Sequence, residues 1–112
     1  MLEIKNNRIR ISRGETAPIM AELDGEIEEG DEITFAVKRN PGDSETLIRL
    51  DSGEDFNVSA GDTAITFIIP HAAFDGVPPG TYFYDIRVIS GGDWQYIVWP
   101  SIFEIVEVVA DA

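Results

Sequence analysis

Apolar and polar residues alternate along most of the chain, the pattern of β-strands with one buried face. The longest alternating run, Gly80–Ile89, follows a rigid Pro78-Pro79 turn and places one set of residues inward: Tyr82, Tyr84, Ile86 and Val88. After a turn at Ser90–Asp93 the chain returns as Trp94–Trp99. The pattern predicts a β-hairpin at the centre of a small β-domain.

Shorter runs predict the remaining strands. At the N-terminus two runs flank Asn6-Asn7, and Asn tolerates the positive φ of a two-residue turn, so Ile4 should lie opposite Ile9 and Glu3 opposite Arg10. Pro100-Ser101 is expected to turn the chain into the last strand. Further strands are expected at Ala17–Leu23, Glu32–Lys38, Leu47–Leu50, Phe56–Val58, Ala64–Ile69 and Ile102–Val108.

The spacing of these runs defines a fold class. Only His71–Phe74, after Pro70, has room for a helical turn, so the protein should be all-β. About 7–9 short strands separated by turn signals are typical of an immunoglobulin-like β-sandwich of two antiparallel sheets. The 112 residues should form a single domain, 1–112.

The amino-acid composition indicates in which compartment the protein is expected. The chain has no cysteine, which excludes disulfides and thiolate chemistry and favours a reducing compartment. Its first residues lack the basic-then-apolar layout of a secretory signal peptide, and no apolar run approaches the roughly 20 residues that cross a bilayer. We therefore expect a soluble protein with no membrane contact.

The formal net charge is -13, from 21 acidic and 8 basic residues. The negative electrostatic potential of such a protein opposes binding to phosphate backbones, so nucleic acid is not an expected partner. The acidic excess has two interpretations: a solvated surface that keeps the protein soluble, or an acidic face that meets the basic N-terminal segment of a neighbouring copy.

Few residues offer chemistry. His71 is the only histidine, and a catalytic role for it would require Ser101 and Asp75 to gather around it. No nucleotide-binding or hydrolase motif occurs, so we expect no enzyme activity and no cofactor. Three acids of one loop, Asp51, Glu54 and Asp55, with Asp43, have two interpretations: a calcium site, or a solvated loop.

The outward side of the central hairpin is the strongest candidate site. Strand alternation places an apolar set there: Phe83, Ile89, Trp94, Tyr96 and Val98. Exposed apolar patches of this kind usually mark contacts with other proteins. Alternatively, the N-terminal hairpin or a register shift covers them. Trp94, Tyr96 and Trp99 are also a candidate platform for sugar stacking.

Four stretches carry a resemblance to a known family: Ile11–Ala17, Gly30–Lys38, Pro79–Ile86 and Ser101–Ile105. Their order is similar to the N-terminal domain family of phage upper baseplate proteins and related small prophage proteins. That family has a Gly-Asp-Thr turn where this chain has Gly14-Glu15-Thr16. The resemblance implies a β-sandwich, a structural role in a virion or surface assembly, and no catalytic residues.

Together these patterns predict a non-enzymatic structural or protein-interaction module of a phage or prophage tail or baseplate. Its partners would be other proteins of the assembly, or further copies of itself as a homo-oligomer. It would reside in the virion, or in the bacterial cytoplasm when expressed from a prophage. The alternative is a carbohydrate-binding or surface-adhesion β-sandwich module.

Overall fold

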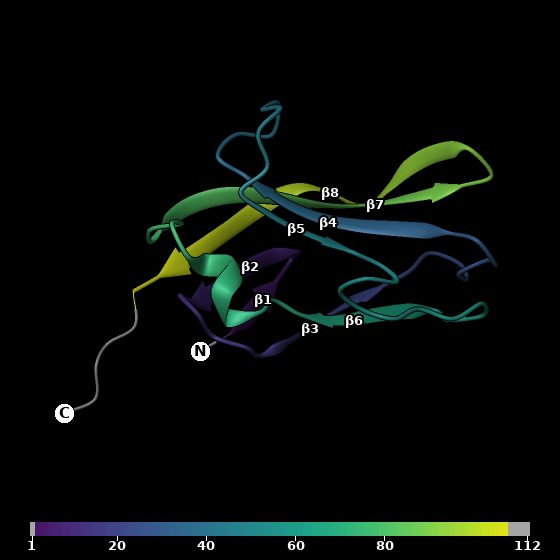
Figure 1. Ribbon diagram of the computed structural model, residues 1–112, viewed down its shortest axis with the longest axis horizontal. Helices are drawn as coiled ribbons and strands as arrows, with labels where there is room; N and C mark the ends of the chain where they lie inside the picture. Colours follow the sequence, from purple (N-terminus) through teal and green to yellow (C-terminus); the bar gives the residue numbers. More distant parts are fainter. Residues whose placement is uncertain (1, 108–112) are drawn as a thin grey trace.

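A computed structural model describes residues 2–107, which form two facing β-sheets (Figure 1). The large sheet has six strands in the order β1-β2-β8-β7-β4-β5, and the small sheet pairs β3 with β6. The elements are β1 (Glu3–Lys5), β2 (Arg8–Ser12), β3 (Pro18–Glu22), β4 (Glu32–Lys38), β5 (Ile48–Asp51), β6 (Ala64–Ile68), the 3-10 turn η1 (His71–Phe74), β7 (Gly80–Ser90) and β8 (Asp93–Val106).

The expected all-β architecture is confirmed, but one pairing differs from the prediction of two antiparallel sheets. β2 runs parallel to β8, with Ile9 beside Phe103 and Ile11 beside Ile105, so the large sheet is mixed. Parallel neighbours need a long connection between them, and here nearly the whole chain separates the two strands. The alternation within β2 did not reveal this direction.

The N-terminal hairpin forms with the predicted register. Ile4 lies opposite Ile9 and Glu3 opposite Arg10. The turn residues adopt positive φ values, 52° at Asn6 and 65° at Asn7, as a two-residue hairpin requires. The asparagine pair therefore specifies this turn.

Two strand predictions were wrong in detail. β8 is one continuous strand of 14 residues through Pro100 and Ser101, where we expected a turn. Irregular pairing with β7, between Tyr84 and Arg87, lets the long strand bend without ending. Phe56–Val58 forms no strand and contributes only an isolated bridge between Ser52 and Phe56. Val108, expected in the last strand, lies outside the described residues.

The core fills the space between the two sheets. Phe35 of β4 is fully buried at its centre and contacts Phe67 of the small sheet, with ring centroids 4.8 Å apart. The ring centroids of Tyr84 and Phe103, both in the large sheet, lie 5.7 Å and 6.0 Å from the ring centroid of Phe35. One aromatic cluster thus joins β4, β7 and β8 to β6.

One end of the sandwich is closed by the segment around η1, where Phe74 is buried as predicted. The guanidinium of Arg13 donates to the carbonyl oxygens of Phe74 and Val77, at 2.9 Å and 2.8 Å. The hydroxyl of Tyr82 donates to the carbonyl oxygen of Pro78 at 2.5 Å, which fixes the entry into β7. No helix of residues 2–107 is long and apolar enough to span a membrane.

Candidate interaction surface

The outer face is the side of the large sheet turned away from β3 and β6. Its central strands are β7 and β8, in which Ile89 lies directly opposite Trp94 and Arg87 opposite Tyr96, as the sequence predicted for Ile89 and Trp94. Ile89 is 44% exposed and Trp94 57%, so the N-terminal hairpin does not cover them. Phe83 and Tyr96 on the same face are partly buried.

The prediction that Val98 belongs to this surface was wrong. Val98 lies opposite Ile86, which faces the core, and is only 7% exposed. An irregularity in the pairing between Arg87 and Ile86 inserts one extra residue of β8, and a shift of one residue exchanges the two sides of a strand. Trp99, which strict alternation from Trp94 places inward, is instead 70% exposed.

Three side chains of β8 form an exposed aromatic cluster, here defined as Trp94, Tyr96 and Trp99. The rings of Trp94 and Tyr96 meet edge to face at 5.2 Å between centroids, and those of Tyr96 and Trp99 lie 4.5 Å apart at 43°. Arg87 adds its guanidinium 5.7 Å from the centroid of the Trp94 ring. A cation over an indole face orders both groups.

A buried carboxyl group lies on the same face as this cluster. Asp85 is on the outer face, paired with Ala36 of β4, yet it is only 5% exposed. Its Oδ1 lies 3.6 Å from Nε of Arg87 and accepts no hydrogen bond from a described residue. Burial raises the pKa of Asp85, and the positive charges of Arg87 and Lys38 only partly oppose this.

The substitution Asp85→Asn should raise the free energy of unfolding relative to the wild type. The difference between the two proteins should grow from about pH 4 to about pH 7. The raised pKa means that the folded state holds a proton at Asp85 more tightly than the unfolded state. The contribution of Asp85 to stability is therefore present below the ordinary carboxyl pKa and is lost as the pH rises through the folded-state pKa.

Urea denaturation of both proteins across this pH range measures the difference. Asp43→Asn, a carboxyl in the β4–β5 connection with no ion pair to another described residue, is the matched control and should give a difference without this trend. A gap between wild type and Asp85→Asn that stays constant or reverses with pH would contradict the account of Asp85.

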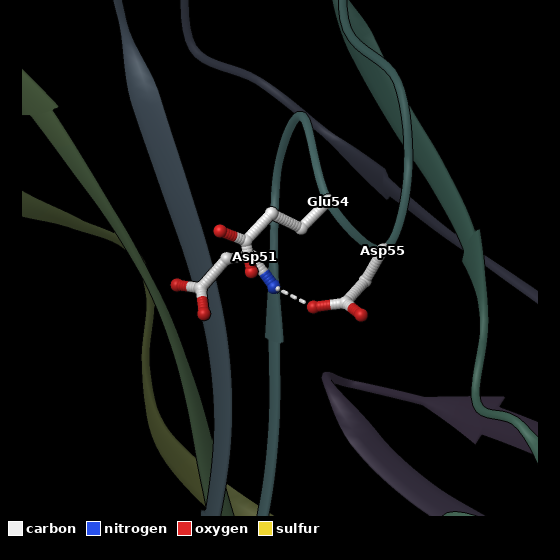
Figure 2. Close-up of side chains that lie close together, drawn as sticks. All are labelled: Asp51, Glu54 and Asp55. Carbon is white, nitrogen blue, oxygen red and sulfur yellow. Dashed lines mark hydrogen bonds between the residues drawn. The ribbon is translucent and has the colours of Figure 1, made fainter.

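The acidic loop after β5 brings together the three carboxyl groups suggested as a calcium site (Figure 2). One oxygen atom of each of Asp51, Glu54 and Asp55 lies within 4.8 Å of the others, whereas Asp43 is not in the group. Both oxygens of Asp51 and one oxygen of Asp55 already have partners. Asp55 Oδ2 accepts the backbone N–H of Asp51 at 2.7 Å, and Asp51 accepts from Thr34 and Arg49.

These hydrogen bonds give the loop a structural role. Desolvation raises the pKa of Asp51, but hydrogen bonds from Arg49 and Thr34 outweigh it and hold the pKa below the usual value. The arrangement joins β4 to β5 and ties the following turn back to the strand. The observed contacts thus favour the solvated-loop interpretation.

Among the described residues, His71 has its hydrogen bond to the backbone and not to Ser101 or Asp75. Its Nδ1 lies 3.0 Å from the carbonyl oxygen of Gly14, and the imidazole is exposed. A Cβ at Gly14 would lie 2.7 Å from the His71 ring, and Gly14 has φ 82°, so both contact and backbone require glycine there. The Ser101 hydroxyl donates to the Trp99 carbonyl oxygen at 2.7 Å and is not aimed at an imidazole.

Comparison with known proteins gave no assignment. No protein-family model matches the chain. The curated proteins likewise contain no significant match. The function must therefore be inferred from the chain's own fold and surface.

Proposed function

We propose that the protein is a non-enzymatic, immunoglobulin-like interaction module of a phage or prophage tail or baseplate, and that it binds other proteins through the outer face. The observation that carries the proposal is the exposed aromatic cluster on β8, one of the two central strands of the large sheet. Indole and phenol rings are enriched at protein interfaces and depleted from free surfaces.

The immunoglobulin-like part of the proposal is supported by topology. Strands β2, β8, β7, β4 and β5 face a β3–β6 pair, and the third residue of β7 is Tyr82, whose hydroxyl donates to the chain four residues earlier. Such a tyrosine at this corner is a hallmark of immunoglobulin-like sandwiches. The small sheet of two strands is reduced relative to that fold.

The phage assignment rests on the sequence resemblance to upper baseplate N-terminal domains. The four stretches that carry it lie in β2, β4, β7, β8 and the turns beside them: Ile11–Ala17, Gly30–Lys38, Pro79–Ile86 and Ser101–Ile105. Residues of this kind specify a scaffold. A structural role is consistent with the exposed apolar residues of the outer face. It is also consistent with the single histidine, His71, whose ring nitrogen contacts the backbone carbonyl oxygen of Gly14.

Carbohydrate binding is the second candidate, favoured by the contiguity of Trp94, Tyr96 and Trp99. Sugars stack on flat aromatic surfaces, and the first two rings are nearly perpendicular at 87°. Of the three rings, that of Trp99 is the most exposed, at 70%. Saturable binding on a glycan array that is lost in Trp99→Ser would favour this candidate over the first.

A photo-crosslinking experiment tests the proposed function. Trp99→p-benzoylphenylalanine places a reactive group in the aromatic cluster, and Thr66→p-benzoylphenylalanine, exposed on β6 in the small sheet, is the control. In native cells induced for phage production, position 99 should give discrete protein adducts and position 66 should not. Those adducts should also be recovered in purified particles.

The outcomes separate the parts of the proposal. Absence of any adduct at position 99 would overturn the interaction role. Adducts that are absent from purified particles would overturn the phage assignment and leave the interaction role standing.

A further inference from the structure

The charges of the protein are distributed unevenly between its surfaces. The outer face carries six Lys or Arg residues and five Asp or Glu residues, a net charge of +1 in a chain of net charge -13, so that all other positions together carry -14. These residues are Glu3, Lys5, Arg8, Arg10, Glu32, Lys38, Arg49, Asp51, Asp85, Arg87 and Glu104. Nearly all of the acidic excess therefore lies off this face.

The charges of the outer face are also compensated locally. Arg10 lies 3.9 Å from Glu3 and 3.8 Å from Glu104, and Arg49 contacts Asp51 at 3.0 Å. Because positive and negative charges alternate over short distances, the electrostatic potential above this surface is weak. On such a surface a second copy meets little like-charge repulsion.

The exposed apolar residues of this face lie on its two central strands, the aromatic cluster on β8 and Ile89 on β7. These strands also carry Asp85, Arg87 and Glu104, but the ion pairs Arg10–Glu3 and Arg49–Asp51 lie wholly on β1, β2 and β5, at or next to the edges. An apolar centre with a polar rim is the usual anatomy of a protein–protein interface.

The face is large enough for a stable contact. Six strands spaced about 4.8 Å apart span about 24 Å, and the seven residues of β4 span about 24 Å in the other direction, a projected area of about 600 Å². Strands β7 and β8, with 11 and 14 residues, extend beyond β4, so the whole face is larger than this projection and comparable with the area of about 800 Å² per partner that a stable interface buries.

From this charge segregation we infer that the partner of the outer face is a second copy of the chain, bound face to face around a two-fold axis. The inference rests on the proposed interaction role and names its partner. Sheets pack about 10 Å apart, so the small sheets of the two copies would lie about 30 Å from each other, well beyond the Debye length of about 8 Å at physiological salt. The net charge of -13 then does not prevent pairing.

Sedimentation equilibrium of the purified protein tests the inference. The wild type should have a mass of about 25 kDa, twice the 12.4 kDa of the chain, at both about 0.15 M and about 1 M NaCl, because apolar contacts persist in salt. Trp94→Ser with Trp99→Ser should raise the dissociation constant by about 30-fold or more, the effect of losing a central aromatic anchor.

Two further variants keep the test decisive. Met20→Ser removes an equally exposed apolar side chain (59%) from the small sheet and should leave the mass unchanged. Ile89→Lys places a charge on the outer face without removing an aromatic ring, and should also weaken association, with circular dichroism confirming that both outer-face variants remain folded.

Three results would overturn the inference. A wild type that stays monomeric at millimolar concentration excludes the second copy, and the interaction role then stands or falls on crosslinks to a foreign protein. Mass that keeps growing beyond two chains indicates head-to-tail association. Association that disappears at high salt, or that Met20→Ser weakens equally, shows that the outer face is not the contact.

Discussion

Phe35→Ala should lower the free energy of unfolding by about 3–5 kcal/mol, the cost expected for truncating a fully buried phenylalanine. Phe35 has no exposed surface and lies on the centre of β4, where its ring contacts rings from both sheets. Its removal leaves a cavity between the sheets that neighbouring rigid strands cannot close.

Chemical denaturation followed by tryptophan fluorescence measures the effect. Ile68→Ala is a suitable control, because Ile68 is exposed on β6 and should change stability by less than about 0.5 kcal/mol. Similar midpoints for Phe35→Ala and the control would mean that the two sheets are not packed around Phe35.

Tyr84→Ala should cost about 2–5 kcal/mol, and Ile86→Ala a similar amount, since both side chains lie in the core from β7. Tyr84 has an additional function: its hydroxyl donates to the carbonyl oxygen of Asn7, in the turn of the N-terminal hairpin. Tyr84→Phe keeps the ring and removes this bond, so it should cost only about 1 kcal/mol.

Hydrogen exchange separates the two contributions of Tyr84. In Tyr84→Phe, amides of β1 and β2 should lose protection while those of β4 keep it, because only the tie to the hairpin turn is lost. Equal loss of stability in Tyr84→Phe and Tyr84→Ala would show that the hydrogen bond, and not the ring, carries the effect.

The parts of the fold that local patterns determine could be predicted from the sequence. The alternation of Tyr82, Tyr84, Ile86 and Val88 predicted the core side of β7, and burial of all four confirms it. Asn6-Asn7 predicted the first hairpin because few residues accept positive φ at both turn positions. Pro70 predicted the start of η1.

Features that depend on distant strands could not be predicted. The pairing irregularities in β8 carry no local signal, so alternation assigned Val98 to the wrong side of the strand. Pro100 suggested a turn because proline lacks an N–H, but a bulged strand also accommodates it. The burial of Asp85 depends on its neighbours across the sheet, so the alternation of residues along the chain does not predict it.

The loop after β5 has a consequence for aggregation. Both backbone groups of Asp51 are engaged by Asp55, whose carboxylate accepts the N–H at 2.7 Å and whose own N–H donates to the carbonyl at 2.9 Å. These two bonds close the end of the β5 edge to an incoming strand of another molecule. At the opposite edge, β1 has only three residues and exposes Glu3 and Lys5. Both features oppose fibre growth by lateral extension of the large sheet, although it exposes two tryptophans.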